Sequence, residues 1–313
     1  MLAVRWGFGE AIGGLVVLAI ITNLPEIAIT ASGALRGELE VAVGNLLGGI
    51  AIQTVVLVLL DVLRPGLPLM SRASSPALKI EAIMVIAVLA VVIIGARLPA
   101  SLQVGHVSPA EVLIVLLWIG GLVWVGRLRR SPSHKAKVAG HPHGHARRQK
   151  ASAAPHKTHC TAWLVMVLIV GAAVTLAGGV VLEGSGKALA NHWGMSGVIF
   201  GATVLALATS LPEISTGWAA IRLGDDCMAV SDIFGGNAFL PVLFLFASLL
   251  SGGAVLPQAK ATDLYLAALG ILLTAVYLAG LMLKSPRRIA GMGVDSLAVL
   301  LLYGAGVLGM LVL

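Results

Sequence analysis

The chain has 313 residues, of which 58% are hydrophobic and 11% are charged, and its mean hydropathy is +0.99. A soluble domain of this length needs more charged residues to cover its surface, so the composition excludes a globular enzyme. The net charge is +7, and nine Lys and Arg residues without any acid lie between Arg127 and Lys157. This clustering indicates membrane topology rather than binding to nucleic acid.

Nine apolar segments follow one another along the chain, each able to cross a hydrocarbon core of about 30 Å as a helix. They lie near residues 8–31, 40–62, 80–96, 110–126, 161–183, 195–220, 228–250, 262–283 and 291–313. Their length and their lack of alternation argue against membrane strands. The predicted fold class is an all-α polytopic membrane protein embedded in a lipid bilayer.

The segment 127–160 is rich in His, Arg, Lys, Ser, Pro and Gly and predicts a disordered linker between two membrane halves, 1–126 and 161–313. With alternating crossings, this linker falls on the same side as two other basic loops, one with Arg64 and Arg72 and one with Arg287 and Arg288. The positive-inside rule makes that side cytoplasmic, together with the N-terminus. A multi-pass protein of a bacterial inner membrane is expected.

An internal repeat relates the two halves. A shift of 187 residues, the separation of Glu26 from Glu213, superimposes Thr-x-Leu-Pro-Glu-Ile at 22–27 on the same pattern at 209–214, and 18 of the 48 positions from 6 to 53 are identical. Because the two copies enter the membrane from opposite sides, they form an inverted-topology repeat. Such repeats are typical of secondary transporters with a site at the midplane.

Glu26 and Glu213 are the strongest candidate site residues, because an ionised carboxylate in an apolar helix needs a cation, a proton or a hydrogen-bond donor. The alternative is a carboxylate held in a structural hydrogen bond. A proline precedes each glutamate and breaks the helical hydrogen bonding, which exposes carbonyl oxygens around Thr22 and Thr209. Carboxylates beside backbone oxygens suit a hard cation such as Ca²⁺ or Na⁺.

A polar face on the following helix adds further candidates. Asn45 and Gln53 share one face of the segment 40–62, and Asp232 occupies the position of Asn45 in the second repeat. We expect them to act as ligands or gate residues, with hydrogen bonding between helices as the alternative.

These motifs resemble the Ca²⁺/cation antiporter superfamily, in particular the prokaryotic sodium/calcium exchangers. The resemblance rests on Thr22-Asn23-Leu24-Pro25-Glu26 and Thr209-Ser210-Leu211-Pro212-Glu213, each followed by a glycine-containing segment, 44–53 and 231–240. It implies that the glutamates chelate Ca²⁺, that Thr22 and Thr209 offer backbone oxygens, and that Ser210 and Gln53 serve neighbouring Na⁺ or water sites.

The chain departs from the family pattern at several positions. Gly49 and Gly236 stand where the family has serines, and Leu240 stands where it has Asn or Asp. Leucine cannot coordinate a cation, so one ligand position is lost and proton coupling becomes a competitor to Na⁺ coupling. The first helix of the family is also expected to be missing, unless the start codon has been placed too late.

The sequence therefore predicts a secondary antiporter that exchanges Ca²⁺ for Na⁺ or H⁺ by alternating access. The alternatives are a Na⁺/H⁺ or other cation/proton exchanger and a non-transporting membrane scaffold or sensor. No catalytic residues and no bound cofactor are expected, because the cations are substrates. The expected partners are cations and the bilayer, and the sequence does not predict an oligomeric state.

Overall fold

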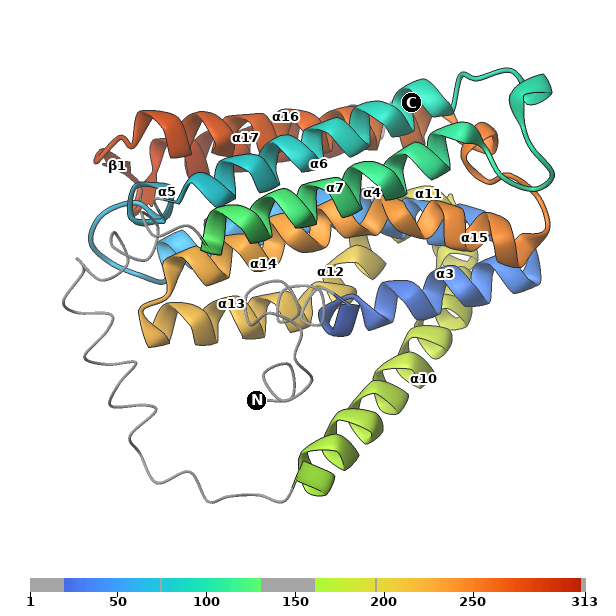
Figure 1. The fold of residues 1–313 in the computed structure, drawn as a ribbon, viewed down its shortest axis with the longest axis horizontal. Coiled ribbons are helices and arrows are strands. Elements are labelled where there is room, and N and C mark those ends of the chain that lie inside the picture. Colours follow the sequence, from blue (N-terminus) through green and yellow to red (C-terminus); the bar gives the residue numbers. More distant parts are fainter. Residues whose placement is uncertain (1–19, 74, 131–160, 195, 311–313) are drawn as a thin grey trace.

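A computed structural model describes residues 20–73, 75–130, 161–194 and 196–310, and these residues form a bundle of helices (Figure 1). The first half contributes α3 (Leu24–Arg36), α4 (Leu39–Val62), α5 (Leu69–Arg72), α6 (Pro76–Gly95), η1 (Ala100–Leu102) and α7 (Pro109–Arg130). The second half begins with α10 (Thr161–Trp193), α11 (Gly197–Phe200), the π-helical η2 (Gly201–Leu205), α12 (Ala206–Thr209) and α13 (Leu211–Leu223). It continues with α14 (Asp226–Phe239), η3 (Leu240–Val242), α15 (Leu243–Ser251), η4 (Leu256–Gln258), α16 (Ala261–Leu283), a hairpin of β1 (Arg288–Ile289) and β2 (Met292–Gly293), and α17 (Val294–Met310).

Each of the nine predicted segments contains helix in the described residues, and six helical spans there are long and apolar enough to cross a membrane. The all-α polytopic prediction is thus confirmed, although several boundaries differ. α6 begins at Pro76 rather than at 80, because the Ser75 side chain accepts a hydrogen bond from the Ala77 amide and caps the helix. α10 continues beyond 183 to Trp193 and ends at Gly194, whose φ of 66° suits glycine. α7 continues to Arg130, and the rest of the predicted linker, 131–160, lies outside the described residues.

The two repeats run in opposite directions from the middle of the bundle. In Figure 1, α3 runs from the middle toward one end, and α13 runs toward the other end. Both helices begin after a break at an equivalent residue, Asn23 (φ −91°, ψ 17°) and Ser210 (φ −83°, ψ 0°). Both end at an equivalent left-handed glycine, Gly37 and Gly224. The duplicated sequence therefore folds into duplicated local structure with inverted direction.

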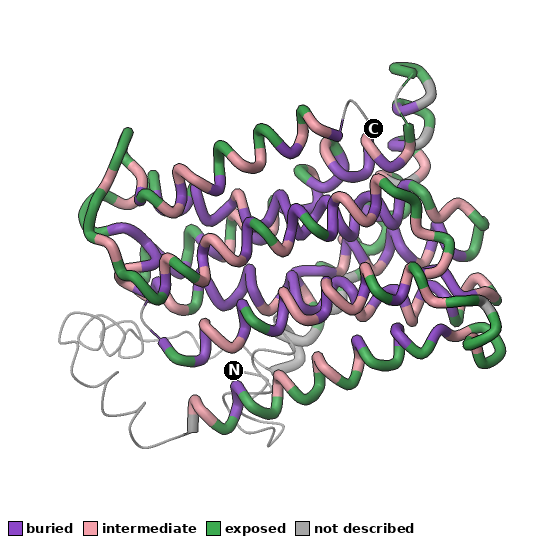
Figure 2. Tube along the Cα trace, turned by 90° about the horizontal axis from the view of Figure 1, so that it is seen from above, coloured by how far each residue is buried: buried purple, intermediate pink, exposed green. Residues whose placement is uncertain are grey.

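Helix α4 lies at the centre of the bundle, and 89% of the residues in its apolar stretch are buried. Helix α7 lies at the edge, and only 28% of the residues in its apolar stretch are buried. Figure 2 shows the buried positions concentrated in the middle of the bundle. Small residues allow the close approach of α4 to the second half: a Cβ added to Gly48 would lie 2.2 Å from the Ala202 Cα. Close packing of this kind holds membrane helices together where the hydrophobic effect between them is weak.

We call the end of the bundle where α7 stops at Arg130 the linker-side face. There Arg64 and Arg72 both pair with Asp226 at the start of α14. Buried Asp61 accepts hydrogen bonds from the Leu69 and Gly293 amides, each at 2.7 Å, and so ties the end of α4 to the β-hairpin. On the opposite face, Lys260 pairs with the exposed Glu40 before α16. Each face therefore carries at least one ion pair between the two halves of the chain.

Candidate cation-binding site

Two carboxylates, one from each repeat, are buried inside the bundle and interact electrostatically. Glu26 of α3 is 0% exposed and Glu213 of α13 is 1% exposed. Among the described residues, neither oxygen of either carboxylate has a hydrogen-bond partner. A carboxylate buried without a donor is unstable as an anion, so the pair requires a cation or protons.

Both glutamates follow a break in their helix. Pro25 and Pro212 have no amide hydrogen, so the carbonyls of Ile21 and Ala208 receive no helical hydrogen bond from them. At the second break, the Thr209 hydroxyl donates to Asn45 Oδ1 at 3.3 Å and to the Ala206 carbonyl at 3.2 Å. Ser210 Oγ donates to the same Ala206 carbonyl at 2.7 Å.

A residue of the first repeat also contacts the helix break of the second repeat. Asn45 of α4 is fully buried, and its Oδ1 is the acceptor for Thr209 of the second repeat. At the first break, Asn23 Nδ2 donates to the Thr22 hydroxyl at 3.4 Å, and both side chains are buried. The two breaks share their backbone geometry, and the second break also contacts the first repeat through Asn45.

Gln53 and Leu240 are equivalent residues of the two repeats, and each lies near a glycine of the other repeat. A Cβ added to Gly236 would lie 3.2 Å from Asn23 Nδ2 and 3.4 Å from Gln53 Oε1. The equivalent Cβ on Gly49 would lie 3.6 Å from Leu240 Cδ1. One side of the site is therefore lined by amide groups, and the symmetry-related side is closed by a methyl group.

Asp232 lies beside this group on α14. It is 6% exposed, one of its carboxylate oxygens accepts a hydrogen bond from the Thr216 hydroxyl, and it interacts electrostatically with Glu213. Thr216 follows Glu213 by almost one helical turn. The structure thus joins Asp232 to α13, whereas the equivalent Asn45 contacts the break at Thr209.

The eight predicted site residues are all buried, and they come from α3, α4, α12, α13 and α14 and from the two helix breaks. Among the described residues, no three His, Cys, Asp or Glu side chains converge as a compact metal centre. The donor set is therefore two carboxylates with hydroxyl, amide and backbone oxygens. Such weak, oxygen-only coordination suits a cation that must also leave.

Sequence reasoning missed a buried ion pair on the linker-side face. Arg129 Nη2 lies 2.9 Å from Glu81 Oε1 and donates to Ser231 Oγ at 2.7 Å. Glu81 is 2% exposed on α6, and Ser231 precedes Asp232. The available signal was an acid inside an otherwise apolar segment. The sequence does not identify Arg129 as the partner of Glu81, because Arg129 falls within the predicted linker.

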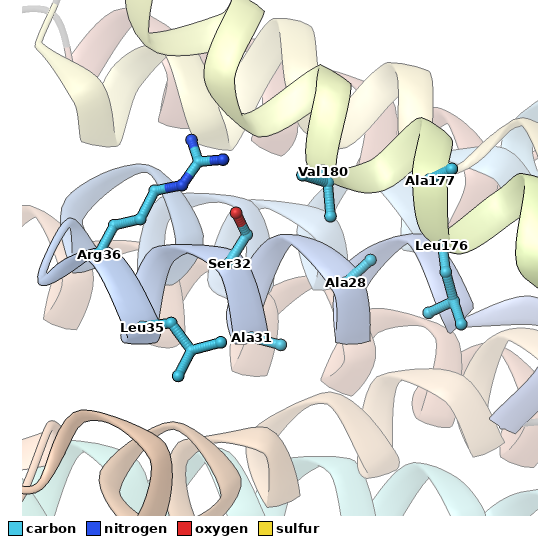
Figure 3. Close-up of a pocket in the computed structure, with 8 residues that line it drawn as sticks. All are labelled: Ala28, Ala31, Ser32, Leu35, Arg36, Leu176, Ala177 and Val180. Atoms are coloured by element: carbon cyan, nitrogen blue, oxygen red, sulfur yellow. The ribbon is translucent and has the colours of Figure 1, made fainter.

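A separate groove of about 470 Å³ lies between α3 and α10 (Figure 3). Ala28 and Ser32 of α3 face Val180 of α10 across it, and neither Glu26 nor Glu213 lines it. The groove is thus a feature of the bundle surface and not the candidate site.

The profile of the sodium/calcium exchanger protein family matches residues 1–126 and 163–312. The chain belongs to this family. The matched residues include every candidate site residue and leave out 127–162, which contains the whole predicted linker. Members of this exchanger family are transporters, and the resemblance based on the duplicated Pro-Glu motifs is confirmed.

The chain matches two curated relatives over most of their length. "Putative antiporter CaxA" of Alkalimonas amylolytica is 29% identical over 284 residues, which is 88% of this chain and 81% of the relative. "Inner membrane protein YrbG" of Escherichia coli K12 is 26% identical over 305 residues, which is 92% of this chain and 83% of the relative.

Solved exchangers share the fold. The sodium-calcium exchanger NCX_Mj superimposes with a TM-score of 0.60 at 18% identity, covering 98% of this chain and 89% of that one. The H⁺/Ca²⁺ exchanger CAX gives a TM-score of 0.63 at 11% identity, covering 98% and 84%. Exchangers coupled to different ions therefore share this architecture, so the fold by itself does not select the counter-ion.

Proposed function

We propose that this chain is a secondary antiporter that moves Ca²⁺ in exchange for a monovalent cation by alternating access. The observation that carries the proposal is the pair Glu26 and Glu213, which are buried, interact electrostatically and have no hydrogen-bond partners for their carboxylate oxygens among the described residues. Each glutamate comes from one of two inverted repeats, so a single cation between them contacts both halves. Movement of one half against the other would then change the side from which the cation is accessible.

Ca²⁺ fits the chemistry of the pair. Two carboxylates neutralise one divalent cation, and Ca²⁺ accepts additional carbonyl, amide and hydroxyl oxygens in flexible geometry. Gln53, Asn23 and the helix breaks offer such oxygens. Mg²⁺ fits less well, because it requires near-octahedral geometry and dehydrates reluctantly.

The two sides of the glutamate pair are lined by different side chains, and this difference affects the choice of counter-ion. Gln53 lines one side, and the Leu240 methyl group closes the related side against Gly49. Oxygen ligands for Na⁺ ions are therefore fewer than in a symmetric shell. Protons need no such ligands, because they bind the two carboxylates directly. Exchange of Ca²⁺ for H⁺ is accordingly the preferred form, and exchange for Na⁺ is the second.

We also propose that the linker-side face is cytoplasmic and that the protein resides in a bacterial inner membrane. The arginines of the loops after α4 and α16 meet on this face, where Arg288 donates to the Arg64 carbonyl at 3.0 Å. Basic residues are retained on the cytoplasmic side during insertion. The name of the relative YrbG, an inner membrane protein, agrees with this location.

The test is ⁴⁵Ca²⁺ uptake into everted vesicles under an imposed H⁺ or Na⁺ gradient. Uptake should follow one of the gradients, and Glu213→Gln should abolish it. Glu40→Gln is the matched control, because Glu40 is an exposed acid outside the site and its loss should leave uptake intact. Uptake that ignores both gradients, or that survives in the Glu213→Gln variant, would contradict the proposal.

A further inference from the structure

At one pair of equivalent positions, the second repeat has a buried carboxylate and the first repeat has a neutral amide. Asp232 and Asn45 are equivalent positions, and both side chains are buried. The Asn45 amide is neutral and accepts from Thr209, whereas the Asp232 carboxylate accepts from Thr216 with only one of its oxygens. The other oxygen, Oδ1, has no hydrogen-bond partner in the described part of the chain.

Asp232 brings the number of buried carboxylates in this region to three. Glu213, which is itself 1% exposed and has no hydrogen-bond partner among the described residues, interacts electrostatically with both Glu26 and Asp232. A divalent cation between the two glutamates neutralises two of the three charges. The third charge remains in a region where an uncompensated ion is costly.

In the described part of the chain, the basic side chains do not supply the missing charge. The nearest arginine along the contacts is Arg129, which bonds to Ser231 next to Asp232, but its ion pair is with Glu81. In the described residues, no Lys or Arg side chain forms an ion pair with Glu26, Glu213 or Asp232. Glu81 therefore compensates Arg129, and Asp232 has no ion-pair partner among the residues that the structure describes.

The third carboxylate does not complete a single compact metal centre. Among the described residues, no three acidic side chains converge on one point. Asp232 is instead displaced along α13 from the glutamate pair toward the linker-side face, as its bond to Thr216 shows. The available ligands at this place are Asp232 Oδ1, the Thr216 hydroxyl and the near side of the Glu213 carboxylate.

We infer that Asp232, Thr216 and Glu213 form a second cation position, which holds a monovalent alkali cation beside the Ca²⁺ bound at Glu26 and Glu213. This inference rests on the proposed function, because it assumes the divalent cation at the glutamate pair. Three carboxylates then balance one divalent and one monovalent cation. Hydroxyl and carboxylate oxygens are the ligands that such a cation prefers.

The test measures binding of ²²Na⁺, and of ⁸⁶Rb⁺ as a K⁺ substitute, to the purified full chain at saturating Ca²⁺. The unmodified protein should retain a bound alkali ion under these conditions, and the two tracers should show which ion is preferred. Asp232→Asn should abolish this binding, while ⁴⁵Ca²⁺ affinity changes by less than roughly tenfold. The asparagine preserves an acceptor for Thr216 and reproduces the residue of the first repeat.

Two further variants keep the test decisive. Thr216→Val leaves every charge in place but removes one ligand, so it should weaken alkali-ion binding by about tenfold. Glu40→Gln removes an exposed acid outside the site and should leave the alkali-ion binding intact. If Asp232→Asn does not fold, Thr216→Val alone decides the question.

Unchanged alkali-ion binding in Asp232→Asn or in Thr216→Val would overturn the inference. So would a Ca²⁺-loaded protein that binds neither tracer, since the third carboxylate would then be neutralised in another way. Absence of Ca²⁺ binding in the unmodified protein would instead contradict the proposed function, so the two failures are distinguishable.

Discussion

The side chain of Asn237 donates a hydrogen bond to the carbonyl of Ile50 at 3.3 Å, and these two residues, 187 apart, are equivalent positions of the two repeats. A residue can contact its own symmetry mate only close to a two-fold axis. The contact therefore places the pseudo-symmetry axis between α4 and α14. Glu26 and Glu213 are a second equivalent pair that interacts, so the candidate cation position lies on the same axis.

Asn237 should stabilise the contact between the repeats. It also donates to the Thr54 hydroxyl at 3.2 Å, and Asn237→Leu removes both bonds. Hydrogen bonds between membrane helices contribute about 0.6 kcal/mol on average and up to about 1.7 kcal/mol, so we expect a loss within this range. Thermal unfolding of the purified protein measures it. An unchanged unfolding temperature would show that the contact contributes nothing.

Equivalent glycines should differ in their tolerance of a methyl group. A Cβ on Gly48 would lie 2.2 Å from the Ala202 Cα, whereas the equivalent Gly235 has no such neighbour within 4 Å. Gly48→Ala should therefore force the helices apart and cost about 1–3 kcal/mol, while Gly235→Ala should be close to neutral. The yield and unfolding temperature of the two variants provide the comparison. Equal effects would contradict the packing at α4.

Gln53 and Leu240 line the two sides of the glutamate pair, and replacing each by the other residue should change ion binding. Gln53→Leu would close the amide-lined side as Leu240 closes the other, and we expect a loss of roughly tenfold or more in Ca²⁺ affinity. Leu240→Gln adds a polar group opposite Gly49 and should increase the effect of Na⁺ on ⁴⁵Ca²⁺ uptake. If Leu240→Gln leaves the Na⁺ dependence unchanged, Leu240 does not limit the choice of counter-ion.

The ion pair of Arg129 with Glu81 should be strongly coupled, because Glu81 is 2% exposed. Arg129→Met alone leaves a buried carboxylate without its partner and should destabilise the protein by about 3–5 kcal/mol. The double variant with Glu81→Met removes both charges and should recover most of this loss. A double-mutant cycle of unfolding free energies tests the coupling, and additive effects would show that the two residues act independently.

The pairs of Asp226 with Arg64 and Arg72 should keep the linker-side face closed. Asp226→Asn removes both pairs, so the half-buried thiol of neighbouring Cys227 should react faster with a maleimide. The experiment uses a background in which Cys160 is replaced by serine. Glu40→Gln breaks the pair with Lys260 on the opposite face and should leave the reactivity unchanged. Equal reactivity in all variants would refute a closing role for Asp226.

The membrane class, the helical segments, the duplicated motif and the two glutamates can all be predicted from the amino-acid sequence. These features depend on hydropathy, on proline and glycine chemistry and on the comparison of one segment with another, all of which are local in the chain. The equivalent helix breaks at Asn23 and Ser210 and the equivalent caps at Gly37 and Gly224 follow from the same local rules.

The contacts between polar groups could not be predicted in this way, because they depend on how the helices pack in three dimensions. Asp232 and Asn45 are equivalent in sequence, yet one contacts Thr216 and the other contacts Thr209. Arg129 reaches Glu81 and Ser231, which are 48 and 102 residues away in the chain. The partner of a buried polar group depends on how helices pack, because any nearby donor or acceptor can satisfy it. A repeated sequence therefore predicts a repeated backbone, whereas the unequal side chains of the two halves make the charge around the shared site asymmetric.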